Sequence, residues 1–167
     1  MRKDPEIFSK RHFGGGSVKV WDGFGSNGKT ELALITTRTK SADYILMLKS
    51  KLLPSGSKIG GKNEIFQQDN ASIHTSRQTK HWLANNLIKY FDWPAKSPDL
   101  NPIENIWGIL ARRVYTNGKQ YYSVSDIKEA IFSAWNSIEP EICQYLVDSM
   151  SNRLFEITRK NGGSIDY

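Results

Sequence analysis

The feature that most restricts the fold of this chain is the order in which short apolar segments and helical segments follow each other. Residues 17–24 and 31–37 read as two strands joined by a hairpin turn at Gly25-Ser26-Asn27-Gly28-Lys29. Residues 64–69 and 88–91 are two further short apolar segments that suit buried strands. Strands interleaved with helices favour a mixed α/β sheet.

Five helices are predicted around these strands, with limits set by capping and breaking residues. The predicted limits are Ser41 to Pro54, Thr75 or Ser76 to Asn86, Asn101-Pro102 onward, Ser125 to Trp135, and Glu139-Pro140 to about Lys160. Helical spacing places Leu87 and Trp107 on the apolar faces of their helices. Residues 57–63 read as a polar loop.

Length and composition bound the class of protein. The 167 residues have room for one domain with a sizeable core. A net charge of +6 and a pI near 9.4 favour a polyanionic partner such as DNA or RNA without requiring one. The single cysteine, Cys143, excludes an internal disulfide and a cysteine metal cluster, and we expect it to be buried on a helix face. It also favours a reducing, intracellular compartment.

No membrane association is predicted. The longest apolar runs are only a few residues, which is too short for a transmembrane helix. The charged start of the chain, Met1-Arg2-Lys3-Asp4-Pro5-Glu6, does not resemble a signal peptide.

Two acidic residues, Asp69 and Glu104, stand at the ends of predicted elements, with 34 residues (70–103) between them. Each has a purely structural interpretation. Asp69 suits a turn, and Glu104 completes capping-box spacing with Asn101, behind a proline at the first helical position. The alternative is that both carboxylates bind a divalent metal for phosphoryl transfer, because Mg²⁺ prefers oxygen ligands.

The residues around these two acids form a longer pattern. It reads Gln68-Asp69-Asn70-Ala71-x-x-His74, followed by Trp93-Pro94-Ala95-x-Ser97-Pro98-Asp99-Leu100-Asn101-Pro102-Ile103-Glu104-Asn105-x-Trp107. This pattern resembles the DDE transposases of the mariner superfamily, and the Tc-element branch in particular, which share the 34-residue spacing. The resemblance extends to Phe13-Gly14-Gly15-Gly16, Trp107-Gly108-Ile109-Leu110 and Arg153-Leu154-Phe155-Glu156.

The resemblance implies an RNase H-like fold, a Mg²⁺- or Mn²⁺-dependent active site and cut-and-paste DNA transposition. Asp69 would be the second catalytic and metal-binding acid of the family, and Glu104 the third. The implied partners are transposon ends and target DNA, with a homo-oligomer as a candidate assembly and the nucleus as the location. Asn70 and His74 would support the site or contact DNA, and His74 has the alternative of a helix-entry residue satisfied by a backbone group.

Several basic residues could follow DNA phosphates. Lys96, Arg112 and Arg113 are the first candidates, and the others are Lys119, Arg153, Arg159 and Lys160. For each of them the alternative is a solvated helix surface.

The chain departs from the family pattern at its start. The first catalytic aspartate and the helix-turn-helix region of the family lie upstream of the segment matching Met1-Arg2-Lys3-Asp4-Pro5. We therefore expect residues 1–160 to be an N-terminally incomplete catalytic domain, truncated at the first strand, and residues 161–167 to be a frayed tail. Unpaired edges are expected at strands 17–24 and 64–69. Asp22 stands where the family usually has glycine. It could substitute for the missing aspartate, but metal ligands must be placed tightly, so a tolerated replacement or an exposed strand residue is expected instead.

Three functions follow from these observations. The first is a transposase catalytic domain that is inactive as this fragment, because one catalytic aspartate is missing. The second is a domesticated, non-catalytic module for DNA binding or protein interaction, which the basic charge would suit. The third is an RNase H-like nuclease with another substrate, and the proline-rich block argues against it.

Overall fold

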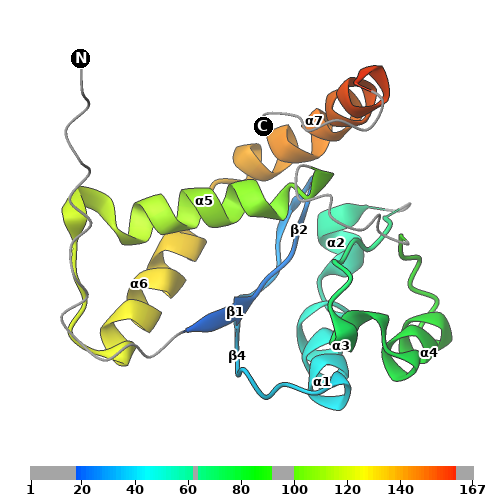
Figure 1. Ribbon diagram of the computed structural model, residues 1–167, viewed down its shortest axis with the longest axis horizontal. Helices are drawn as coiled ribbons and strands as arrows, with labels where there is room; N and C mark the ends of the chain where they lie inside the picture. Colours follow the sequence, from blue (N-terminus) through cyan, green and yellow to red (C-terminus); the bar gives the residue numbers. More distant parts are fainter. Residues whose placement is uncertain (1–17, 62–63, 92–99, 161–167) are drawn as a thin grey trace.

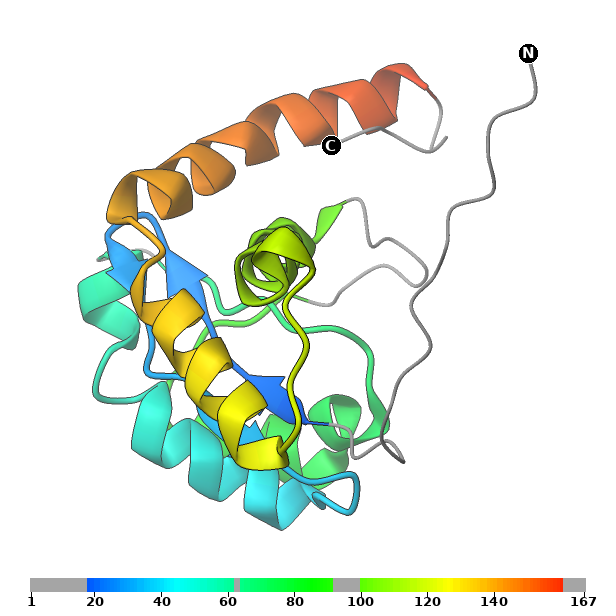
Figure 2. The same ribbon diagram turned by 90° about the vertical axis from the view of Figure 1, so that its left-hand side faces the viewer.

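Helices lie on both sides of a few short strands (Figures 1 and 2). The computed structural model describes residues 18–61, 64–91 and 100–160. The strands are β1 (Lys19–Trp21), β2 (Phe24–Gly25), β3 (Gly28–Lys29) and β4 (Ala33–Ile35). The helices are α1 (Ser41–Lys51), α2 (Gly56–Gly60), α3 (Ser72–Thr75), α4 (Arg77–Asn85), α5 (Ile103–Val114), the 3₁₀ helix η2 (Thr116–Gly118), α6 (Val124–Asn136) and α7 (Pro140–Arg159).

The opening hairpin is confirmed, but its strands are interrupted. β1 pairs with β4 and β2 pairs with β3, both antiparallel, around the predicted turn. Between the two ladders, the amide of Gly23 donates to Thr30 Oγ1 at 2.9 Å, and the amide of Thr30 donates to the carbonyl of Gly23 at 2.7 Å. The Thr30 hydroxyl thus replaces a backbone acceptor. This substitution ends the regular pairing.

The other two predicted strands are reduced to one contact. Phe66 and Tyr90 form an isolated parallel bridge, and neither segment 64–69 nor 88–91 forms an extended strand. Among the described residues, the strands therefore form two separate two-stranded sheets and not one mixed sheet.

The segment predicted as a polar loop over residues 57–63 starts as helix α2. This helix lies against the hairpin, where the amide of Asn27 donates to the carbonyl of Ile59 at 2.8 Å. A Cβ at Gly25 would lie 2.4 Å from that same carbonyl oxygen. Glycine at position 25 therefore lets the hairpin approach the helix backbone, and this long-range contact outweighs the local loop signal.

The predicted helix caps at Ser41 and Ser125 are wrong. Ser41 is the first helical residue of α1, because Asp43 accepts from the amide of Lys40 and so makes position 40 the cap. Ser123, and not Ser125, caps α6 by accepting from the amide of Asp126 at 3.0 Å. These start sites share an acid three residues after the cap, where a carboxylate favours the helix N-terminus.

Ser76 caps α4 as predicted, accepting from the amide of Thr79 at 3.1 Å. The other end of α4 closes with Leu87, which is 89% exposed and has a φ of +56°. Its amide bonds to the carbonyl of Ala84, and the amide of Ile88 bonds to that of Leu83, which is the Schellman pattern. The prediction that Leu87 belongs to the apolar face of α4 is therefore wrong.

Two hydrophobic clusters lie on the two faces of β1. Val20 packs on the first cluster and Trp21 on the second, as expected for successive residues of a strand. The buried members of the first are Leu32, Ile106, Leu110, Val114, Ala134, Trp135, Ile138, Cys143 and Leu146, and those of the second are Tyr44, Leu48 and Leu83. Cys143 is fully buried on α7, as predicted. None of the helices in the described parts of the chain is long and apolar enough to span a membrane.

Candidate active site

Asp69 lies just beyond the short bridged segment. The amide of Phe66 donates to the carbonyl of Lys89 at 2.7 Å, and this bond fixes the segment that leads to Asp69. Asp69 Oδ1 then accepts from the amide of Ala71 at 3.0 Å and lies 2.5 Å from His74 Nδ1. The bond to the amide two residues ahead is that of an Asx turn. Asp69 therefore has the turn role that the sequence suggested. Both of these hydrogen bonds use the same carboxylate oxygen, Oδ1.

His74, on α3, is held in place by Tyr44 and Gln68. The rings of His74 and Tyr44 have centroids 4.4 Å apart, and the Tyr44 hydroxyl donates to Gln68 Oε1 at 2.8 Å. Gln68 in turn donates to the carbonyl of His74 at 3.2 Å. Burial raises the pKa of Tyr44, and the negative charge of Asp69 raises it further, so its hydroxyl stays a neutral donor.

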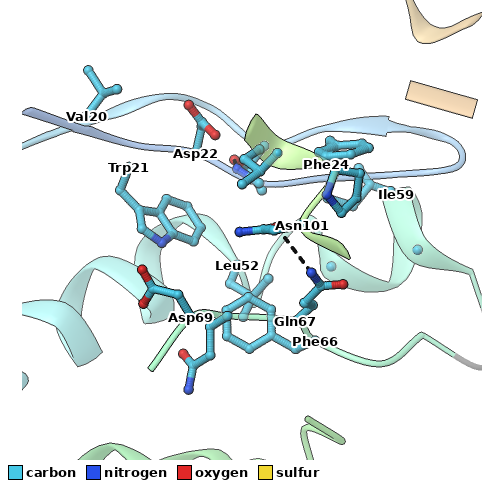
Figure 3. A pocket seen from close by; sticks show the side chains of 18 of the residues that line it. Val20, Trp21, Asp22, Phe24, Leu52, Ile59, Phe66, Gln67, Asp69 and Asn101 are labelled. Atoms are coloured by element: carbon cyan, nitrogen blue, oxygen red, sulfur yellow. Dashed lines mark hydrogen bonds between the residues drawn. The ribbon is translucent and has the colours of Figure 1, made fainter. Parts of the chain in front are cut away.

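Glu104 occupies the first turn of α5, where its side chain is exposed. The predicted capping box is wrong, because α5 has Pro102 at the N-cap position and no side-chain cap. Asn101, the expected cap, instead accepts from Gln67 Nε2 at 3.1 Å through Oδ1 (Figure 3). This bond connects the start of α5 to the segment that carries Asp69.

The two carboxylates line different hollows. Asp69 lines a cavity of about 1150 Å³, whereas Glu104 lies in a second hollow of about 630 Å³ together with Arg112. Within residues 18–61, 64–91 and 100–160, no three His, Cys, Asp or Glu side chains lie close enough together to hold a metal ion. The metal and catalytic roles of Asp69 and Glu104 remain predictions.

The cavity that Asp69 lines lies between the strands β1 and β2 on one side and the segment 64–69 on the other. Val20, Trp21 and Phe24 lie on one wall, and Leu52 and Phe66 lie on the other (Figure 3). The space is open to solvent, and at about 1150 Å³ it is slightly larger than the roughly 300–1,000 Å³ of common ligand clefts. It lies between the two strands whose edges the sequence predicts to be unpaired.

Asp22 is buried, which corrects the expectation of an exposed strand residue. It is 8% exposed, and the indole nitrogen of Trp107 donates to both of its oxygens, at 3.3 and 3.2 Å. Burial raises the pKa of Asp22 to about 6, although the Trp107 hydrogen bond opposes the shift. Trp107 itself is 39% exposed and is not the core residue that helical spacing predicted. Asp22 and Asp69 lie on opposite walls of the cavity in Figure 3.

The basic residues proposed for DNA contact fall into different environments. Arg112 is exposed, whereas Arg113 donates to Ser137 and Glu139 at 2.7 and 2.9 Å. Arg153 is only 2% exposed, so it is neither a solvated surface residue nor available to DNA. Asn70 is exposed, and Lys96 lies outside the described residues.

The donor chemistry of the two candidate ligands fits a hard divalent ion. Mg²⁺ is commonly bound by one or two carboxylates, with waters or substrate phosphates completing its shell. Asp69 offers Oδ2, which has no hydrogen bond among the described residues, and the Glu104 carboxylate has no partner within that part of the chain either.

The family model for the DDE superfamily endonuclease matches residues 4–128. The Tc3 transposase of Caenorhabditis elegans is 44% identical over 167 residues, covering 100% of this chain and 51% of that protein. The Tc1 transposase of the same organism is 34% identical over 92% of this chain and 56% of its own length. The chain thus spans about half the length of these relatives.

Solved structures of Mos1 mariner transposase share the fold. Its catalytic domain superposes with a TM-score of 0.76 at 18% identity, covering 89% of this chain and 76% of that one. The Mos1 paired-end complex with Mn gives a TM-score of 0.78 at 16% identity, covering 99% of this chain and 51% of that one. The predicted RNase H-like α/β fold class is therefore confirmed. The chain belongs to the DDE superfamily endonucleases, as a catalytic domain of the Tc1/mariner transposase branch.

Proposed function

We propose that this chain provides the catalytic domain of a cut-and-paste DNA transposase, acting on transposon ends and target DNA in the nucleus. The observation that supports the proposal is a hydrogen bond between the two segments that carry the predicted acids. Gln67 ties the segment bearing Asp69 to Asn101 at the start of α5, three residues before Glu104. Sequence identity of 44% to the Tc3 transposase over the whole chain supports the same function.

Asp69 and Glu104 would hold Mg²⁺ or Mn²⁺, the metals named in the related Mos1 catalytic-domain structures. A bound divalent ion activates the attacking oxygen and stabilises the leaving oxygen of a phosphodiester. His74 and the amide of Ala71 keep Asp69 Oδ1 occupied, so Oδ2 is the atom left for the ion. Orientation by such outer partners commonly contributes 10- to 100-fold, in round figures, to metal affinity.

Metal binding tests this assignment directly. Mn²⁺ titrations followed by electron paramagnetic resonance should show affinity reduced by about tenfold or more in Asp69→Asn and in Glu104→Gln. Asp148→Asn is the matched control, because Asp148 is an exposed acid on α7 that accepts from Gln144 of the same helix. Unchanged Mn²⁺ affinity in both site variants would show that these acids are not metal ligands.

DNA binding tests the partner. Fluorescence anisotropy with a labelled duplex should show salt-dependent binding, since each neutralised phosphate adds about −0.9 to the slope of log K against log salt. Arg112→Ala should reduce that slope by roughly 1. Lys49→Ala is the control, because Lys49 is an exposed cation on α1 that is not among the residues predicted to follow DNA phosphates. An equal slope in Arg112→Ala and the unmodified chain would exclude Arg112 from the DNA path.

A non-catalytic DNA-binding or protein-interaction module is the second candidate. It is favoured by the placement of Asp69 and Glu104 in different hollows. For such a module, DNA affinity would be the same with EDTA and with Mn²⁺, and it would not change in Asp69→Asn or Glu104→Gln. A divalent-dependent change in DNA affinity that both substitutions abolish would instead favour the transposase site.

A further inference from the structure

The first turn of α5 is stabilised by a contact with another helix. Among the residues that the structure describes, no side chain caps this helix, so its first amides have no capping partner there. Glu104 and Asn105 lie in this turn, and their amides donate to the carbonyls of Asn101 and Pro102, at 3.1 and 3.2 Å. A turn held in this way frays unless tertiary contacts stabilise it.

Arg153 of α7 supplies such a contact. Its Nη2 donates to Asn105 Oδ1 at 2.8 Å, across 48 residues of sequence. α7 crosses α5 near the start of that helix (Figures 1 and 2). A guanidinium is always charged, and a buried charge must be hydrogen-bonded in good geometry. Since Arg153 is 2% exposed, its bond to Asn105 has little freedom to vary.

The Arg153 side chain is itself fixed on its own helix. Its Nε donates to Ser149 Oγ at 3.0 Å, one turn back along α7. The Ser149 hydroxyl is oriented in turn by donating to the carbonyl of Leu146 at 2.7 Å. This chain of bonds runs from the α7 backbone through Ser149 and Arg153 to Asn105, and no flexible surface side chain takes part in it.

Stabilisation of α5 by the helix dipole does not explain this placement. The positive end of a helix dipole lies at its N-terminus, where an anion is favourable and a cation is not. A guanidinium against the first turn therefore acts through its hydrogen bond, which fixes where the turn lies. The residue next to Asn105 in that turn is Glu104.

We infer that Arg153 is a positioning residue, which holds the first turn of α5 against α7 and so fixes where Glu104 presents its carboxylate. The inference rests on the proposed function, because that function gives Glu104 its role as a metal ligand. It replaces the sequence-based expectation that Arg153 follows DNA phosphates. Arg153 acts on the site through Asn105, as a positioning residue and not as a ligand of the metal.

Hydrogen exchange measured by mass spectrometry tests the inference without any metal. In Arg153→Lys, the amides of Glu104 and Asn105 should exchange about tenfold faster, as expected for loss of one hydrogen bond to a charged group. The amides of α6 should keep their rates. Asn105→Ala, which removes only the acceptor, should give the same local effect, and the double variant should add nothing further. Arg159→Lys, at the exposed end of α7, is the control.

Mn²⁺ affinity is the second readout. It should fall about tenfold in Arg153→Lys and in Asn105→Ala and remain unchanged in Arg159→Lys. If the unmodified chain binds no Mn²⁺, the metal part of the proposed function fails, and the exchange data alone decide the role of Arg153. Exchange that is unchanged at Glu104 and Asn105, or that accelerates equally in α6, would overturn the inference.

Discussion

The buried carboxyl of Asp22 makes the stability of this domain depend on pH in a defined direction. Burial raises the pKa of Asp22 from its ordinary 3.8 to about 6 in the folded chain. The folded state therefore binds this proton more tightly than the unfolded state. The stability that Asp22 contributes is fully present below pH 3.8, falls as the pH rises and is lost above about pH 6.

The magnitude follows from the two pKa values. The difference between 3.8 and about 6 corresponds to about 3 kcal/mol of unfolding free energy once Asp22 is ionised in both states. At pH 8 the ionised Asp22 lowers the unfolding free energy by this full amount, whereas at pH 4.5 it lowers it by about 1 kcal/mol. Asp22→Asn removes the charge and keeps an oxygen that can accept from Trp107. It should therefore stabilise the chain by about 3 kcal/mol at pH 8 and about 1 kcal/mol at pH 4.5.

Urea unfolding followed by tryptophan fluorescence measures this difference. Unmodified chain and Asp22→Asn are compared at pH 4.5 and pH 8, with Asp148→Asn as an exposed control that should change stability by less than about 0.5 kcal/mol. The reasoning is refuted if Asp22→Asn gives the same gain at both pH values, or if it destabilises the chain at pH 8. Either result would mean that burial does not disfavour the charged carboxylate.

Three further substitutions test the packing, one helix end and one cap by the same unfolding assay. Leu48→Ala should cost about 2–5 kcal/mol because Leu48 is fully buried, whereas Leu46→Ala, at a position 65% exposed, should change little. Leu87→Gly should stabilise by about 1 kcal/mol because it relieves a left-handed φ of +56°, and Leu87→Ala, which keeps a Cβ, should not. Ser76→Ala should cost about 1 kcal/mol by removing the cap that accepts from Thr79, and a loss near zero would exclude a capping role.

Local signals in the sequence predicted the local structure well. The turn between β2 and β3, the cap at Ser76 and the start of α7 at Glu139-Pro140 are all confirmed. Each depends on backbone geometry and hydrogen bonds within a few residues. The sequence motifs around Asp69 and Glu104 also identified the family, because their residue types and spacing are specific enough to recognise without coordinates.

Predictions failed where a distant partner decides the outcome. Asn101 suits a capping box locally, but its side-chain oxygen accepts from Gln67. Residues 57–63 suit a loop locally, but the contact between Asn27 and Ile59 holds a helix there. In both cases a single long-range hydrogen bond competes with a local preference worth only about 1 kcal/mol.

The sequence by itself determined the family and the α/β class, and it predicted that Asp69 and Glu104 bind the metal. Only the tertiary structure decided which charged residues are buried and whether the two acids share a cavity. Arg153 and Asp22 look like surface residues in the sequence, yet partners 48 and 85 residues away enclose them. Helical spacing predicted that Trp107 is buried, yet its indole donates to the Asp22 carboxylate from a partly exposed position. Burial and charge pairing are properties of the packed chain, because they depend on which distant segments meet.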